Sequence, residues 1–273
     1  MRDSAADPAL ELWPARVVVD GAAHELPDPV VVEEPLEIQV GGQPLVVTMR
    51  TPGHDRELAA GWLFGEGLIE TREDLLALVD GAAAGRANVV DVRLRDERAV
   101  AAARAARGFL SASACGVCGK TAIEHVFARG LPALPGGRPQ VARAWLEGLP
   151  ARMRAAQPLF ARTGGLHAAA LFAAGGELAV LREDVGRHNA VDKLVGERLL
   201  AGARLDDAVL LLSGRAGFEI VQKAARAGIA LVAAMGAPSS LALRVAERSG
   251  MTLVGFLRPG RFNLYTGSGR IEP

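Results

Sequence analysis

The second half of the chain alternates short apolar runs with longer amphipathic stretches, and this alternation restricts the possible folds more than any other feature of the sequence. When a helix connects two strands of one sheet, the two strands run parallel and the connection is a right-handed crossover. A hairpin of 167–173 and 177–181 precedes the alternation. We therefore predict an α/β fold with a mostly parallel sheet covered on both faces. The predicted strands are 208–212, 229–234 and 252–257, and the predicted helices are 188–200, 218–227 and 239–249.

The first half is richer in strand patterns. The predicted strands are 16–20, 36–40, 45–50 and 88–95, and the first fifteen residues show no ordered pattern. Gly41 and Gly42 predict a hairpin turn between two of these strands. One helix is predicted over 54–64 and a second from Thr71, whose hydroxyl can cap it. The stretch 99–108 fits either a helix or a strand.

A linker separates the two halves. Residues 131–139 (LPALPGGRP) combine proline and glycine, which interrupt helices and strands, and they follow a predicted helix at 121–129. We place a domain boundary there. An N-terminal, strand-rich α+β domain then covers 16–130, and a C-terminal α/β domain covers 140–266 and begins with a helix at 141–147.

Charge and hydropathy exclude several classes of protein. The 273 residues carry 31 basic and 31 acidic side chains, so no global field attracts nucleic acid or an anionic membrane. No apolar run approaches the roughly 20 residues that span a bilayer. The N-terminus has no secretory pattern. We expect a cytoplasmic protein with no nucleic-acid or membrane partner.

Cys115 and Cys118 are the only cysteines, and in a reducing compartment such a pair is catalytic or metal-binding more often than a structural disulfide. Lys120 and a helix starting after Gly119 would both favour the thiolate form. A zinc site would need two further ligands, from five scattered histidines or from carboxylates. The His-x-Glu and Pro-Cys-x-x-Cys patterns of zinc deaminases are missing. Spacing alone leaves redox chemistry, metal binding and sulfur transfer open.

Three loops place arginines and other polar residues at the carboxyl ends of predicted strands, where open α/β sheets bind ligands. They are 182–189, followed by Asp192 and Lys193, then 213–215, and 258–263, which ends the ordered pattern. Each loop alone fits an ordinary turn with a solvated arginine. Three on one edge indicate a large anionic ligand, because arginine chelates oxygen pairs and glycine lets the backbone approach. No usual nucleotide-binding motif is present.

Five motifs together resemble the formate dehydrogenase accessory sulfurtransferase (FdhD) family. They occur in the family's order and cover nearly the whole chain, with Trp62 and Gly217 where phenylalanine and serine are expected. The motifs are 51–67 (TPGHDRELAAGWLFGEG), 113–120 (SACGVCGK), 183–193 (EDVGRHNAVDK), 213–223 (SGRAGFEIVQK) and 255–265 (GFLRPGRFNLY).

The resemblance implies a sulfur relay. A cysteine desulfurase loads sulfur onto Cys115 as a persulfide, Cys118 is the second thiol, and the sulfur passes to the molybdenum of bis-molybdopterin guanine dinucleotide for formate dehydrogenase. This cofactor is bound as substrate, and no permanent cofactor or metal is implied. The family's cofactor-binding loop corresponds to Phe256, Leu257, Arg258, Pro259, Gly260 and Arg261. The resemblance also implies a homodimer and a C-terminal domain that resembles cytidine deaminases, a fold reused without zinc chemistry. A cofactor chaperone without sulfur chemistry and a structural zinc module are the alternatives.

Overall fold

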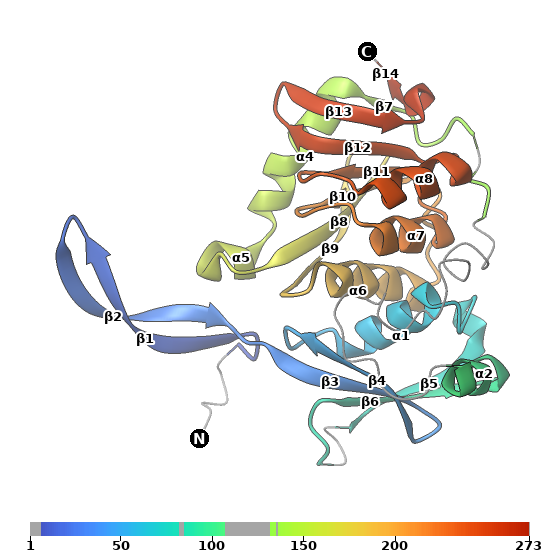
Figure 1. Cartoon of the computed structure of the whole chain (residues 1–273), viewed down its shortest axis with the longest axis horizontal. Helices are drawn as coiled ribbons and strands as arrows, with labels where there is room; N and C mark the ends of the chain where they lie inside the picture. Colours follow the sequence, from blue (N-terminus) through green and yellow to red (C-terminus); the bar gives the residue numbers. More distant parts are fainter. Residues whose placement is uncertain (1–6, 82–84, 107–131, 135, 273) are drawn as a thin grey trace.

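The structure, a computed structural model, describes residues 7–81, 85–106, 132–134 and 136–272, which form two main sheets and a long hairpin (Figure 1). The mixed α/β class is confirmed. The division into domains at 16–130 and 140–266 stays a prediction. In the part of the chain that is described, no helix has the length and apolar character needed to cross a membrane.

The larger sheet belongs to the second half of the chain. Its strands lie in the order β13-β12-β11-β10-β8-β9. They are β8 (His167–Ala173), β9 (Leu178–Asp184), β10 (Ala208–Leu212), β11 (Leu231–Ala234), β12 (Thr252–Arg258) and β13 (Arg261–Thr266). The predicted strands are therefore confirmed to within a few residues at their ends.

The prediction of a mostly parallel sheet is wrong. Only β10–β11 and β11–β12 pair in parallel, whereas β8 and β13 run against their neighbours. β8, and not β9, joins the hairpin to β10. At the other edge, Pro259 and Gly260 make a tight turn, with Gly260 at φ +72°. The chain therefore continues into β13, beyond the predicted end of the ordered pattern.

Helices cover both faces of this sheet, as predicted. Helices α6 (Arg187–Leu200), α7 (Phe218–Arg226) and α8 (Ser240–Ser249) cover one face, and α4 (Arg143–Ala155) covers the other. Successive side chains of a strand point to opposite faces of the sheet. Leu210 therefore packs in the core under α6–α8, and Leu211 packs in the core under α4. The helix expected at 141–147 begins two residues later, after the short strand β7 (Val141–Ala142), which pairs with β14 (Ile271–Glu272).

The smaller sheet belongs to the first half and has the order β4-β3-β6-β5. Its strands are β3 (Glu34–Val40), β4 (Gln43–Arg50), β5 (Leu75–Asp80) and β6 (Val89–Leu94), and its helices are α1 (Asp55–Gly65) and α2 (Arg98–Ala106). The turn at Gly41 and Gly42 and the helix 54–64 are confirmed. Of the open stretch 99–108, the described residues 99–106 are helical and belong to α2.

The helix expected to begin at Thr71 is wrong. Asp74 accepts hydrogen bonds from the N–H groups of Glu70 and Thr71, and this cap closes only the short 3-10 turn Arg72–Asp74. The next residues form β5, which pairs antiparallel to β6. The ladder to β6 therefore outweighs the local start signal for a helix.

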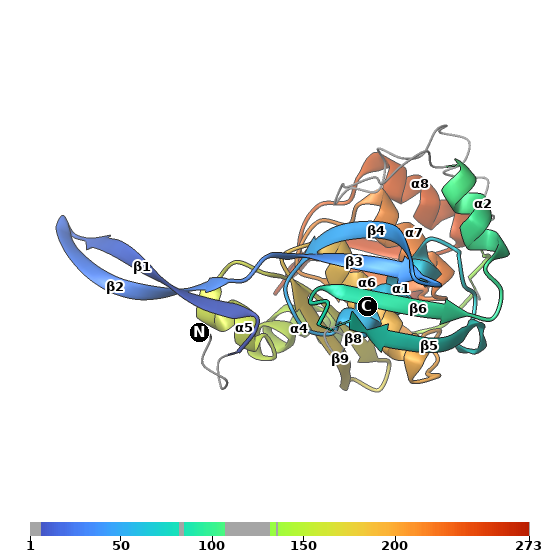
Figure 2. The same cartoon turned by 90° about the horizontal axis from the view of Figure 1, so that it is seen from below.

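A two-stranded hairpin, formed by β1 (Leu10–Val19) and β2 (Ala22–Val31), extends from the body of the molecule (Figures 1 and 2). We name these residues, 10–31, the arm. The expectation that the first fifteen residues lack order is wrong from Leu10 onward. The base of the arm packs against α5 (Pro158–Thr163).

Helices α1 and α6 cross at van der Waals distance and join the two sheets. A Cβ atom added to Gly61 would lie 1.8 Å from the carbonyl oxygen of Asp192, and one added to Gly196 would lie 1.9 Å from that of Glu57. Two glycines facing each other therefore allow the helix backbones to touch. The crossing positions the motif 183–193 directly against the first half of the chain.

Candidate functional site

Cys115 and Cys118 lie outside the described residues, together with Lys120 and the helix predicted at 121–129. The described chain reaches this segment from α2 and resumes beside α8, where the N–H of Leu134 donates to the carbonyl of Ser249 at 2.9 Å. The roles of both cysteines stay predictions.

The three arginine-containing loops lie on one edge of the larger sheet, as predicted. β9, β10, β11 and β12 run in the same direction, so the residues that follow Asp184, Leu212, Ala234 and Arg258 all leave the sheet on that side. The loops differ in what their side chains contact.

The loop 182–189 and the Lys193 that follows it use several charged and polar groups in contacts inside the protein, so Arg182, Asn189 and Lys193 do not face a bound anion as predicted. Arg182 binds both carboxylate oxygens of Glu57, at 2.6 and 3.0 Å. Lys193 Nζ lies 2.7 Å from Asp184 Oδ2 and 2.8 Å from the carbonyl oxygen of Thr51. Asn189 donates to the carbonyl of Met49. Burial makes these contacts structural, because an unpaired charge at such positions is costly.

Two further pairs of side chains join this motif to the motif 213–223 within the fold. Lys223 Nζ lies 2.6 Å from Asp192 Oδ1, and both residues are buried. His188 Nδ1 lies 3.7 Å from Glu219 Oε2. The motifs 183–193 and 213–223 thus contact each other through α6 and α7. Several of their charged side chains pair with one another and hold α6 against α7.

The loop 256–261 is different, because it presents its charged groups to solvent. Leu257 is buried, whereas Phe256 is 42% exposed and has φ +54°. Such a backbone conformation costs about 1–3 kcal/mol for a residue other than glycine and is concentrated at functional sites. The N–H of Gly260 donates to Glu147 at 3.3 Å.

Arg258 and Arg261 face each other across the turn of this hairpin. Both are exposed, and no described carboxylate lies within ion-pair distance of either. Like charges directly opposite each other in a strand pair repel. An anion bound between the two guanidinium groups would remove this repulsion. This arrangement is consistent with a cofactor-binding loop at 256–261, which stays a prediction.

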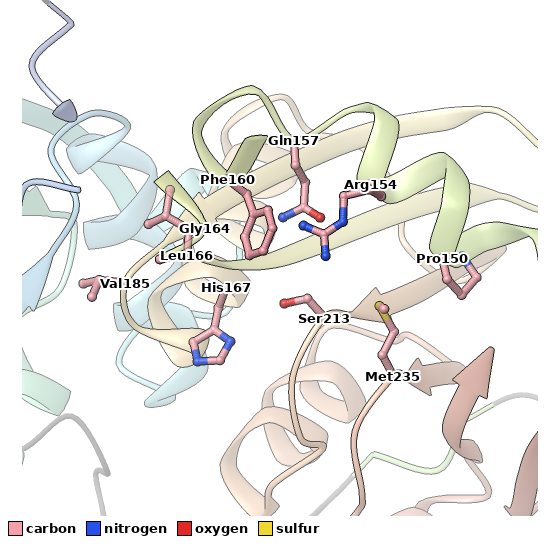
Figure 3. Close-up of a pocket in the computed structure, with 11 residues that line it drawn as sticks. Pro150, Arg154, Gln157, Phe160, Gly164, Leu166, His167, Val185, Ser213 and Met235 are labelled. Carbon is pink, nitrogen blue, oxygen red and sulfur yellow. The ribbon is translucent and has the colours of Figure 1, made fainter. Parts of the chain in front are cut away.

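A pocket with a cavity of about 390 Å³ opens at the same edge, between α4, α5 and the ends of β9, β10 and β11 (Figure 3). Glu183 accepts hydrogen bonds from the N–H groups of Leu159 and Phe160 and so fixes α5 against β9. The lining residues are Pro150, Arg154, Gln157, Phe160, Gly164, Gly165, Leu166, His167, Val185, Ser213 and Met235.

The electrostatic surroundings of the pocket are positive. Burial, Arg187 and Arg215 lower the pKa of His167, while Asp184 acts weakly in the opposite direction. The lowered pKa favours the neutral imidazole of His167. No acidic residue occurs among the described residues that line the cavity.

The sequence predicts only part of this pocket. Ser213 and the neighbouring Arg215 belong to a predicted arginine loop, and His167 is one of the five scattered histidines. Arg154, Gln157 and Phe160 were missed, because α4 and α5 come before the strand–helix alternation and carry no motif. Only the fold brings them over the strand ends.

Comparison with known proteins gives a consistent result. The family model described as FdhD/NarQ matches residues 31–272. The sulfur carrier protein FdhD of Streptomyces avermitilis is 49% identical over 261 residues, 92% of each chain. That of Mycobacterium tuberculosis is 49% identical over 90% of this chain and 92% of its own.

A solved structure is also similar. The crystal structure of a formate dehydrogenase accessory protein from Desulfotalea psychrophila superposes with a TM-score of 0.78 and 28% sequence identity, and the match covers 97% of this chain and all of the other.

Proposed function

The chain belongs to the FdhD/NarQ family, and from this membership we propose that it is a sulfur carrier that serves formate dehydrogenase. The observation that carries the proposal is the pair Cys115 and Cys118 in a chain 49% identical to a named sulfur carrier over nearly its full length. We assign the activity of a sulfurtransferase, with Cys115 as the carrier and Cys118 as the second thiol.

Loading follows the chemistry of thiol–disulfide exchange. The thiolate of Cys115 attacks the terminal sulfur of a cysteine desulfurase persulfide, the S–S bond of the donor breaks, and the donor cysteine leaves as a thiolate. Cys115 then holds one added sulfur as a persulfide. In the delivery step the S–S bond at Cys115 would break, and Cys115 would leave as a thiolate. The outer sulfur would pass as a neutral sulfur atom to the substrate of the transfer, the molybdenum of bis-molybdopterin guanine dinucleotide, which would supply the two electrons that convert it to sulfide.

The loop Phe256–Arg261 is the proposed binding element for that cofactor. Its exposed, mutually repelling Arg258 and Arg261 suit a pyrophosphate, which a guanidinium pair can bind through several charge-assisted hydrogen bonds. Phe256 offers an exposed ring beside them. We also propose that the protein works in the cytoplasm, the compartment expected from the sequence.

The arm supports a further part of the proposal, a homodimer. It exposes apolar side chains on both faces, and a two-stranded hairpin in water is marginally stable by itself. The exposed side chains are Leu12, Trp13, Val18, Val19 and Leu26. A second copy that packs on the arm would cover them. We also propose that the C-terminal sheet has the cytidine-deaminase topology, which its initial hairpin and following strand–helix units support.

The decisive experiment measures sulfur on the carrier. After incubation with a cysteine desulfurase and cysteine, mass spectrometry should find one added sulfur on the peptide that contains Cys115, and Cys115→Ala should abolish both this addition and formate dehydrogenase activation in cells. Cys118→Ala is the matched control and should keep the first sulfur. A variant lacking both cysteines that still activates formate dehydrogenase would instead establish a cofactor chaperone. About one zinc per purified chain would establish the zinc module.

A further inference from the structure

The turn between β12 and β13 makes a contact to a distant carboxylate. The N–H of Gly260 donates to Glu147 Oε2 at 3.3 Å, and Glu147 lies on α4, which packs against β12 (Figure 1). Gly260 is exposed, so water is able to satisfy this N–H and the turn does not need a protein acceptor. The fold thus places a carboxylate at a donor that does not require one.

This donor lies where an anion is expected. Pro259 and Gly260 form the turn between Arg258 and Arg261, whose guanidinium groups are proposed to bind a pyrophosphate. Gly260 has φ +72°, and a backbone N–H in such a turn is itself a donor for anions. Carboxylate and phosphate oxygens accept the same charge-assisted hydrogen bonds. Glu147 therefore occupies a donor that an incoming phosphate would also use.

Glu147 has a second partner on its own helix. Its Oε1 lies 3.3 Å from Arg143 Nε, one turn earlier on α4. The two contacts use different oxygens, so the carboxylate is able to leave Gly260 and keep its ion pair with Arg143. The side chain of Arg143 is 62% exposed, and such surface pairs form and break at little cost in free energy. Glu147 is thus held loosely between the turn and the helix.

We propose that Glu147 is an internal competitor for the anion that the loop Phe256–Arg261 binds. Its carboxylate holds the N–H of Gly260 until a phosphate oxygen replaces it, moves toward Arg143 while the phosphate is bound, and returns when the phosphate leaves. The competition lowers the affinity of the loop, which suits a carrier that must hand its substrate on. The inference rests on the proposed function, because that loop is the proposed cofactor-binding element, and it concerns the regulation of the same site.

Calorimetric titration of the full-length protein with inorganic pyrophosphate tests the competition. Glu147→Gln removes the negative charge and keeps the size of the side chain. This variant should bind pyrophosphate at least roughly fivefold more tightly, because a unit negative charge beside a phosphate repels it even in water. An affinity equal to that of the wild type, or a weaker one, would overturn the proposal.

Glu247→Gln is the matched control, because it removes the same charge at a place far from the turn. Glu247 lies in the last turn of α8, which ends just before β12 begins, whereas Gly260 follows the end of β12. The two residues therefore lie near opposite ends of that strand, and salt screens charges over such a distance. The control should change the affinity less than roughly twofold. Equal tightening in both variants would show that overall charge, and not the contact at Gly260, sets the affinity.

A double-mutant cycle tests the displacement toward Arg143. Arg143→Met should weaken pyrophosphate binding by roughly threefold in the wild-type background, because the displaced carboxylate loses its ion pair. In the Glu147→Gln background the same change should weaken binding by roughly 1.5-fold or less, since no carboxylate is left to displace. Equal effects in the two backgrounds would show that Arg143 acts on pyrophosphate through its own charge and would refute the displacement.

Arg258→Met separates a failure of this inference from a failure of the proposed function. If this variant weakens pyrophosphate binding while Glu147→Gln leaves it unchanged, the loop binds anions as proposed and only the competition is refuted. If Arg258→Met binds like the wild type, the proposed binding element fails and the inference fails with it, as both do when pyrophosphate binds neither the wild type nor Glu147→Gln. Binding that is measurable only in Glu147→Gln would support the competition most strongly.

Discussion

Glu57 and Arg182 form a bidentate ion pair between helix α1 and strand β9. Burial acts to raise the pKa of Glu57, but hydrogen bonds from His54 and Arg182 outweigh it and lower the pKa from 4.5 to about 2. For a fully shielded group such a shift is worth about 3 kcal/mol. Solvent screening at this half-buried site reduces it to about 1–2 kcal/mol.

The folded-state pKa lies below the ordinary value, so this stabilisation is complete above about pH 4.5 and is lost as the pH falls toward 2. Glu57→Gln should therefore lower the free energy of unfolding at pH 7 by about 1–2 kcal/mol. The difference from the wild type should fall by roughly half or more between pH 7 and pH 3. Urea unfolding at the two pH values measures both quantities.

The control is the exposed pair Asp96 and Arg98, whose side chains are 50% and 91% exposed. Asp96→Asn should leave the free energy of unfolding unchanged at pH 7, because water screens such pairs. A Glu57→Gln variant as stable as the wild type at pH 7 would contradict the assigned role of the α1–β9 pair.

At the scale of elements, the crossing of α1 and α6 depends on two glycines. A methyl group at Gly61 or Gly196 would overlap a backbone carbonyl of the opposite helix, which cannot move away as a side chain can. Gly61→Ala and Gly196→Ala should each destabilise the protein by about 3 kcal/mol or more, measured by chemical unfolding.

Gly148 provides the matched control, because it lies within helix α4 and a Cβ added there meets no atom within 4 Å. Gly148→Ala should stabilise the protein by about 0.5–1 kcal/mol through helix propensity. If Gly61→Ala were tolerated equally well, the helices would have to sit farther apart than the structure shows.

These elements also show where sequence patterns succeed. The strands at 208–212 and 252–257 and the turn at Gly41 and Gly42 were predictable, because periodicity and turn chemistry are local. The prediction of a helix from Thr71 was wrong, because the structure of this segment depends on pairing with β6, whose residues lie farther along the chain. The prediction of strand direction was wrong for the same reason, since no local sequence pattern indicates that β8 pairs with β10.

At the scale of the whole molecule, the candidate site was predictable only in part. The topology placed the loops after Asp184, Leu212 and Arg258 on one edge, as expected from the strand–helix order. The ion pair of Arg182 with Glu57 and the hydrogen bond of Lys193 to the carbonyl of Thr51 were not predictable, because Glu57 and Thr51 come from the other half of the chain. Gln157 was not predictable as a pocket residue, because α4 and α5 carry no motif and only the fold brings them over the strand ends.

The arm carries the last prediction, which concerns assembly. Trp13 and Leu26 lie on the same face of the hairpin, since Trp13 pairs with Asp28 and Ala15 with Leu26, two positions along. They are 56% and 53% exposed. If a second copy covers this face, the double variant Trp13→Lys with Leu26→Lys places two charges in an apolar interface, where central aromatic contacts dominate the binding energy.

Light scattering coupled to size exclusion should then show a wild-type dimer of a 28.5 kDa chain, with a dissociation constant raised at least roughly 100-fold in the double variant. Leu76→Lys is the control, because Leu76 is 60% exposed on β5, away from the arm, and should leave the dimer intact. A wild-type protein that stays at the mass of one chain up to high concentration would show that no second copy covers the arm. A control that dissociates as readily as the double variant would show that added charge, and not the arm, controls assembly.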